Sequence, residues 1–240
     1  MYSPLRHILW ATTPWMLLAT TLRTVGVVTW PDGKLLFSAA EFALFIAFLL
    51  ASQRSIELTG GNVSYAGMGL WRQLNVAKGV LLRIALLGYA AYYAAWYVGV
   101  RSVCSTPVVY GFDAIAFNRF NDFMLAWGPA MALATYLMVA EQATGRSPTF
   151  AGGVGLLSQH WRFLLPATAL LIPALVVFNS VQWSVGPLVR QVFEPTGFQA
   201  LTAAATIVFL FAFASLRLVG TVLILTLALK ASYKSLSRSA

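Results

Sequence analysis

The sequence is poor in the residue types that carry most enzymatic chemistry. Of 240 residues, one is cysteine and two are histidine. A single thiol, Cys104, excludes an intramolecular disulfide framework and any metal site with several thiolate ligands. His7 and His160 have no second His, Cys or carboxylate at metal-binding spacing. The sequence therefore predicts no metal and no cofactor. Because it also has no serine-nucleophile motif, we expect a protein that is not an enzyme.

Charged residues are scarce as well. They make up 10% of the chain, against about 25% in soluble domains, whereas 59% of the residues are hydrophobic. The apolar residues occur in runs of about 17 to 25, each long enough to cross the hydrocarbon core of a bilayer as a helix. We predict an all-α, polytopic membrane protein in which residues 1–240 form a single transmembrane domain. Six transmembrane helices are expected near residues 8–30, 35–52, 79–99, 121–140, 162–181 and 200–229.

The few charges are distributed unevenly between the two predicted sides of the membrane. If the amino terminus is cytoplasmic, nine cations and two carboxylates fall inside, whereas four cations balance four carboxylates outside. Short cytoplasmic loops are enriched in Lys and Arg, so this pattern predicts that both termini are cytoplasmic. The outer charges are Lys34, Arg101, Arg119, Arg190, Asp32, Asp113, Asp122 and Glu194.

The same asymmetry explains the net charge of +9 without a nucleic-acid partner. Nucleic-acid binding needs an exposed basic patch or a recognition motif, and the sequence has no such motif. We expect membrane lipids as partners instead, with anionic headgroups gathered at the cytoplasmic face.

Arg23 interrupts the first apolar run, where a guanidinium costs roughly 2.5 to 3.5 kcal/mol on insertion scales. The following TWPDGKL has strong turn chemistry, so the first two runs should form a helical hairpin. Arg23 lies nine residues before Asp32 and Glu41 nine residues after it, which places both at about the same depth. We predict an intramembrane ion pair between Arg23 and Glu41. Such a pair either fixes the helix register or belongs to a transport or proton-relay site.

Arg217 is the other deep cation. Its apolar run is longer than a bilayer requires, so we expect its side chain to reach the cytoplasmic boundary, the alternative being a substrate contact. In LLIPALVVFNS, Pro173 and Asn179 indicate either a broken helix lining a pathway or a packing kink with a polar helix end. Arg217, Asn179 and Pro173 are therefore the candidate pathway or interface residues.

One polar cluster occurs on the predicted outer side, in GFDAIAFNRFND. We interpret it as a solvated cap on the fourth span, with a catalytic site as the alternative. The cluster consists of Asp113, Asn118, Arg119, Asn121 and Asp122.

Residues 35–99 and 121–181 resemble each other. Each stretch has an apolar helix end, a polar segment with Gly, a Ser/Thr–aromatic–Ala–Gly segment and a basic residue before the next span. We predict two parallel helical-hairpin repeats whose linkers form short interfacial helices on the cytoplasmic side, capped by Ser64 and Ser147 with Pro148 at the first helical position. Their aromatic and basic residues suit the headgroup layer. These residues are Tyr65, Trp71, Arg72, Phe150, His160, Trp161 and Arg162.

The stretch EQATGRSPTFAGGVGLLSQHWRFLLPATALL, with LALKASYKSL near the carboxyl end, resembles a loose group of bacterial six-span inner-membrane proteins. This group includes the membrane region attached to some glycerophosphodiester phosphodiesterases. The resemblance covers mainly residues 140–180 and the tail. It implies a six-span fold in the bacterial inner membrane, and it carries no catalytic residue to this chain.

These observations predict a non-enzymatic integral inner-membrane protein that acts as a scaffold or assembly subunit of a larger membrane complex. Its protein partners would lie within the membrane, since Gly, Ala and Trp positions offer helix contacts. The alternative is a small transporter for a lipid-like or anionic solute.

Overall fold

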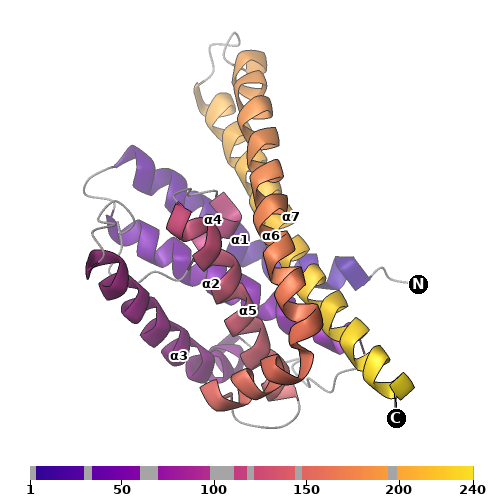
Figure 1. The fold of residues 1–240 in the computed structure, drawn as a ribbon. Helices are drawn as coiled ribbons and strands as arrows, with labels where there is room; N and C mark the ends of the chain where they lie inside the picture. The colour runs from indigo at the N-terminus through magenta and orange to yellow at the C-terminus, as the bar shows by residue number, and fades with distance from the viewer. Residues whose placement is uncertain are drawn as a thin grey trace.

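A computed structural model describes residues 4–29, 34–59, 70–97, 111–117, 122–143, 148–193 and 199–239 of the chain. All regular structure in these ranges is helical, as the sequence predicts (Figure 1). The helices are α1 (Pro4–Val28), α2 (Lys34–Leu58), α3 (Leu70–Tyr97), α4 (Phe112–Phe117), α5 (Asp122–Ala143), α6 (Phe150–Phe193) and α7 (Gln199–Ser239).

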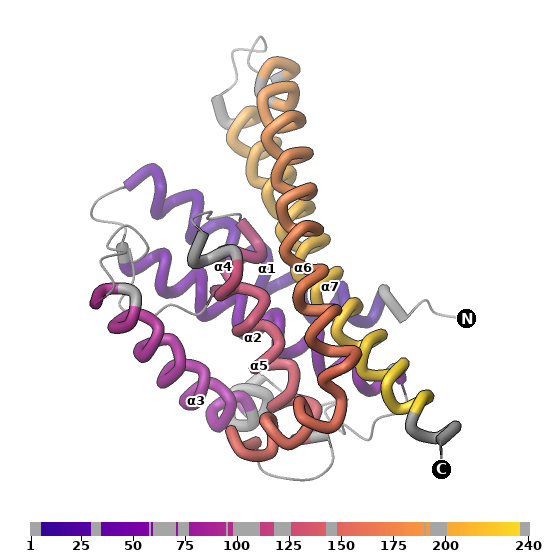
Figure 2. Tube along the Cα trace, in the orientation of Figure 1, coloured from indigo at the N-terminus to yellow at the C-terminus, as the bar shows by residue number. Residues whose placement is uncertain are grey.

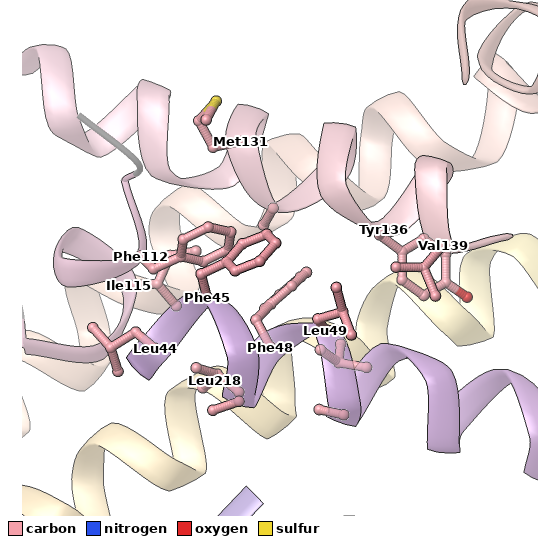
Figure 3. Close-up of a cluster of buried hydrophobic side chains, with 14 of the residues drawn as sticks. Leu44, Phe45, Phe48, Leu49, Phe112, Ile115, Met131, Tyr136, Val139 and Leu218 are labelled. Atoms are coloured by element: carbon pink, nitrogen blue, oxygen red, sulfur yellow. The ribbon is translucent and has the colours of Figure 1, made fainter. Parts of the chain in front are cut away.

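The central helix of the fold is α2, which packs against α1, α4, α5 and α7. Of its apolar stretch, 72% is buried inside the protein. Phe48 and Phe45 lie against Phe112 of α4, with ring centroids 5.1 and 6.0 Å apart. Figure 3 shows this core between α2, α4, α5 and α7. If lipid surrounds the protein, such contacts stabilise it by close packing rather than by exclusion of water.

The longest helices, α6 and α7, form a hairpin that projects beyond the other helices (Figures 1 and 2). Their 44 and 41 residues correspond to about 66 and 62 Å, roughly twice the thickness of a hydrocarbon core. The first turns of α6 lie across the lower end of the molecule before the helix rises beside α7 (Figure 1). Pro166, Pro173 and Pro187 each remove one backbone hydrogen bond from α6, which permits bending without ending the helix.

Within the described ranges, three helices are long and apolar enough to cross a membrane: Leu35–Glu57, Phe150–Val189 and Leu201–Ser235. These lengths and compositions are those of a membrane protein. Each of the six predicted spans overlaps a described helix, although the six-span count and the repeats stay predictions. The main difference concerns α6, which joins the predicted interfacial segment and the predicted fifth span into one continuous helix.

Candidate functional site

The short helix α4 lies inside the protein, and all six of its residues are buried. Two glycines allow it to approach α5. Gly111, just before α4, has a φ of 82°, a conformation that other residues rarely adopt. A Cβ on Gly111 would lie 3.1 Å from the Cα of Gly128 in α5. With α4 held against α5 in this way, its first turn contacts α1 and α2.

At that first turn, Asp113 forms an ion pair with Arg23 of α1. The Nη1 atom of Arg23 lies 2.8 Å from Oδ1 of Asp113, and the two side chains are 17% and 7% exposed. The guanidinium also lies 5.0 Å from the ring centroid of Phe117 and 5.7 Å from that of Phe37. Arg23 therefore meets a carboxylate and two aromatic rings, which together offset part of the cost of burying a guanidinium in an apolar interior.

Glu41 of α2 reaches the same end of α4. Its Oε1 accepts a hydrogen bond of 3.2 Å from the backbone N–H of Asp113. The first N–H groups of a helix have no intrahelical partner, so a carboxylate at this position stabilises α4. The structure thus brings Arg23 and Glu41 to one site, but the ion pair that it records for Arg23 is with Asp113. The Arg23–Glu41 pair stays a prediction.

The burial of Asp113 shows that the interpretation of GFDAIAFNRFND as a solvated cap is wrong for this residue. The residue is only 5% exposed, because α4 packs against α2, α5 and α7 instead of lying in solvent before the fourth span. The other members of that polar cluster, Asn118, Arg119 and Asn121, lie outside the described residues, as does the side chain of Asp122.

Arg217 of α7 contacts the other end of α4. The residue is 2% exposed, and its Nη1 donates a hydrogen bond of 3.4 Å to the backbone carbonyl of Ala116. A cation near the last carbonyls of a helix is favourable. The side chain of Arg217 is therefore directed to α4 in the protein interior, and its position relative to the cytoplasmic boundary stays a prediction.

The guanidinium of Arg217 is incompletely paired. Its Nε and Nη2 atoms are buried and have no hydrogen-bond partner among the described residues. A buried donor without a partner costs about 1 to 3 kcal/mol, and more when it is charged. Arg23, Asp113, Glu41 and Arg217 together form what we call the α4 charge cluster, which ties α1, α2 and α7 to one short helix.

A second buried polar contact joins α6 to the end of α7. Nδ1 of His160 lies 2.8 Å from Oγ of Ser232, and the His160 ring contacts the Tyr233 ring, with centroids 4.5 Å apart and planes tilted by 60°. His160 is 2% exposed, so its side chain faces the protein interior, and its predicted place at the depth of the headgroup layer stays a prediction. It lies on the inner face of α6.

The other predicted interfacial residues behave differently. Trp161 and Arg162 are exposed next to His160, and the guanidinium of Arg162 lies 5.8 Å from the Trp161 ring centroid. Phe150 and Trp71 are 40% and 81% exposed. Tyr65 and the side chain of Arg72 lie outside the described residues.

Glu141 of α5 holds the start of α6. Its Oε2 accepts a 2.8 Å hydrogen bond from the backbone N–H of Thr149, and its Oε1 accepts one of 3.2 Å from the Thr149 hydroxyl. The same hydroxyl accepts a 2.9 Å bond from the N–H of Gly152, which makes Thr149 the N-cap. The predicted cap, Ser147, lies outside the described residues, and Pro148 precedes the cap instead of following it.

The candidate pathway residues Pro173 and Asn179 lie in the projecting hairpin. Because α6 runs unbroken through Pro173 and Asn179, the broken-helix alternative is wrong, and Asn179 does not lie at a helix end. A packing kink at Pro173 stays a prediction. Asn179 and Gln182, one turn apart, each have a buried side-chain oxygen without a hydrogen-bond partner among the described residues. A groove of about 410 Å³ lies beside Gln182. It is lined by Gln182, Trp183, Gly186, Pro187, Val189, Thr206, Phe209 and Leu210.

No family model, curated protein or solved structure matches this chain. A group of three or more metal-ligating side chains is not found in the described part of the chain. The two features that remain for a functional interpretation are the α4 charge cluster and the apolar surface of the α6–α7 hairpin.

Proposed function

We propose that this protein is a non-enzymatic scaffold or assembly subunit of a larger membrane complex, in the bacterial inner membrane. The observation that carries the proposal is the environment of α6. Only 17% of its apolar stretch is buried inside the protein, against 72% for α2. The chain therefore has one helix that forms its core and another that offers nearly its whole length to the surroundings.

Lipid alone does not account for this hairpin. A helix of about 66 Å is too long for one bilayer thickness, even after part of its first turns is assigned to the interface. The exposed apolar residues continue along its whole length, from Val154 to Val192. A neighbouring membrane protein of comparable height would cover this surface.

Asn179 and Gln182 are partly exposed on the hairpin, although their side-chain oxygens are buried. Amide side chains between membrane helices act as hydrogen-bonding contacts, whereas lipid tails offer no hydrogen-bond partner. The exposed hydroxyls of Ser180 and Ser184 differ, because they already donate to carbonyls of their own helix, at 3.1 and 2.9 Å. These two serines provide matched control positions.

The test is the size of the complex in a mild detergent that preserves membrane assemblies. Wild-type protein should migrate on native gels as a particle of fixed stoichiometry, larger than a monomer. Asn179→Leu together with Gln182→Leu should release the monomer, whereas Ser180→Ala together with Ser184→Ala should not. A monomeric wild type, or complexes equally stable in both variants, would contradict the proposal.

A second candidate function is a small transporter for a lipid-like or anionic solute. The observation that favours it is the buried ion pair of Arg23 and Asp113, because ionised groups inside membrane proteins often belong to ion or substrate pathways. Solute flux in proteoliposomes should then fall when Glu41, which contacts the same helical turn, is replaced by Gln. Unchanged flux would remove this cluster from any pathway.

A further inference from the structure

We propose that Arg217 binds a phosphate-type oxyanion through its Nε/Nη2 edge. A guanidinium offers a planar edge on which the Nε–H and one Nη2–H point in the same direction, at the spacing of two oxygens of one phosphate group. In this protein that edge is buried and has no hydrogen-bond partner among the described residues. The other terminal nitrogen, Nη1, donates to Ala116 and so fixes the orientation of the group.

The charges of the α4 cluster explain why an external anion suits this position. The carboxylate of Asp113 meets Arg23 at 2.8 Å, and Glu41 accepts the Asp113 N–H, so both recorded carboxylate contacts lie at the first turn of α4. Arg217 contacts Ala116, about one turn further along. Arg217 is therefore a cation held at the opposite end of α4 from the recorded contacts of both carboxylates.

Two sources of an oxyanion share the chemistry of this edge, a lipid headgroup and a dissolved ion. Arg23 lies five residues before the end of α1, and Glu41 lies seven residues after the start of α2. At 1.5 Å per residue, these two residues are about 8 to 10 Å from those helix ends, and the contact of Arg217 with Ala116 lies about one turn of α4 away from theirs. The phosphate of an anionic lipid and free inorganic phosphate share the chemistry that the guanidinium edge recognises.

The inference does not depend on either function proposed above, because binding is measured directly. The full chain is purified in a neutral maltoside detergent, and its melting temperature is followed as inorganic phosphate replaces chloride at constant ionic strength. A parallel series uses nanodiscs of phosphatidylcholine with and without phosphatidylglycerol. When the ligand exceeds its Kd about 100-fold, the melting temperature should rise by roughly 5 to 10 °C.

Three variants assign the effect. Arg217→Lys keeps the charge but removes the paired donors, so the apparent affinity should fall at least about tenfold. Arg217→Gln should abolish the shift. Arg162→Gln, which removes an exposed arginine from α6, should respond like the wild type. If Arg217→Gln does not fold, the lysine variant decides the question.

The two series separate the possible sources of the oxyanion. A rise with inorganic phosphate supports a solute site, and a rise only with phosphatidylglycerol supports a headgroup site. The proposal is overturned if neither ligand stabilises the wild type. It is also overturned if the Arg217→Lys variant binds as tightly as the wild type.

Discussion

The contact between Gly152 and Glu141 gives the sharpest prediction about stability. Gly152 occupies the third position of α6, directly against the carboxylate of Glu141. A Cβ at Gly152 would overlap the Oε1, Cδ and Oε2 atoms of Glu141. Because Glu141 is 5% exposed and is held by two hydrogen bonds to Thr149, an alanine at position 152 must displace it from those bonds.

The expected magnitude follows from the bonds that are lost. A hydrogen bond to a charged group contributes about 1.5 to 3 kcal/mol, and the 2.8 Å bond to the Thr149 N–H also holds the start of α6. Alanine is the better helix former by about 0.5 to 1 kcal/mol, which offsets part of this loss. With both bonds to Glu141 lost, we expect Gly152→Ala to lower the free energy of unfolding by about 2 to 5 kcal/mol.

Gly155 is the matched control, because it lies in the same helix and a Cβ there would meet no atom within 4 Å. Gly155→Ala should be neutral or stabilising by up to about 1 kcal/mol. Unfolding is measured by titration with SDS in mixed micelles, followed by circular dichroism. The Glu141→Ala background removes the overlap, so Gly152→Ala should there behave like Gly155→Ala. Equal effects of the two glycine substitutions in the wild-type background would refute the reasoning.

Three further predictions use the same unfolding assay. Asp113→Asn leaves Arg23 buried without its anion and should lower the free energy of unfolding by about 3 to 5 kcal/mol. The double variant with Arg23→Gln should lose less than the sum of the two single changes, and strict additivity would argue against the ion pair. Ser232→Ala removes the partner of His160 Nδ1 and should cost about 1 to 3 kcal/mol, whereas an unchanged midpoint would show that the bond does not form. Gly111→Ala places a side chain at a positive φ and close to α5, so it should lower the free energy of unfolding by about 2 kcal/mol or more and reduce the abundance of the protein in membranes. A variant as stable as the wild type would contradict the position assigned to α4.

The helical class of this protein could be predicted because apolar runs of bilayer length leave few alternatives. The requirement of Arg23 for a buried anion was also predictable, since an unpaired guanidinium in an apolar segment is costly. The partner that the structure records for Arg23 was not predictable. Asp113 lies far along the chain, in a helix of six residues that is too short to show a periodic pattern.

The depth of Arg217 illustrates a second limit of sequence reasoning. Its apolar run is longer than a bilayer needs, so composition allows several positions along the membrane normal. Its contact with Ala116 could not be predicted either, because the two residues are 101 positions apart in the chain. His160 is similar. Its neighbours Trp161 and Arg162 do face outward, but an α-helix turns by about 100° per residue, so adjacent residues need not share an environment.

The α4 charge cluster connects the stability of this fold with the two proposals made for the protein, assembly and oxyanion binding. An isolated helix of six residues would not form, because nucleation is unfavourable and helices below about 12 residues are marginal. Glu41 at its first N–H groups and Arg217 at its last carbonyls supply the missing partners, and Arg23 binds its carboxylate. The helix therefore depends on α1, α2 and α7 being in place together. Because α7 packs against α6 in the projecting hairpin, an anion bound at Arg217 would change the stability of the hairpin that presents the proposed assembly surface. Assembly and oxyanion binding are thus expected to be thermodynamically coupled, each strengthening or weakening the other by the same factor.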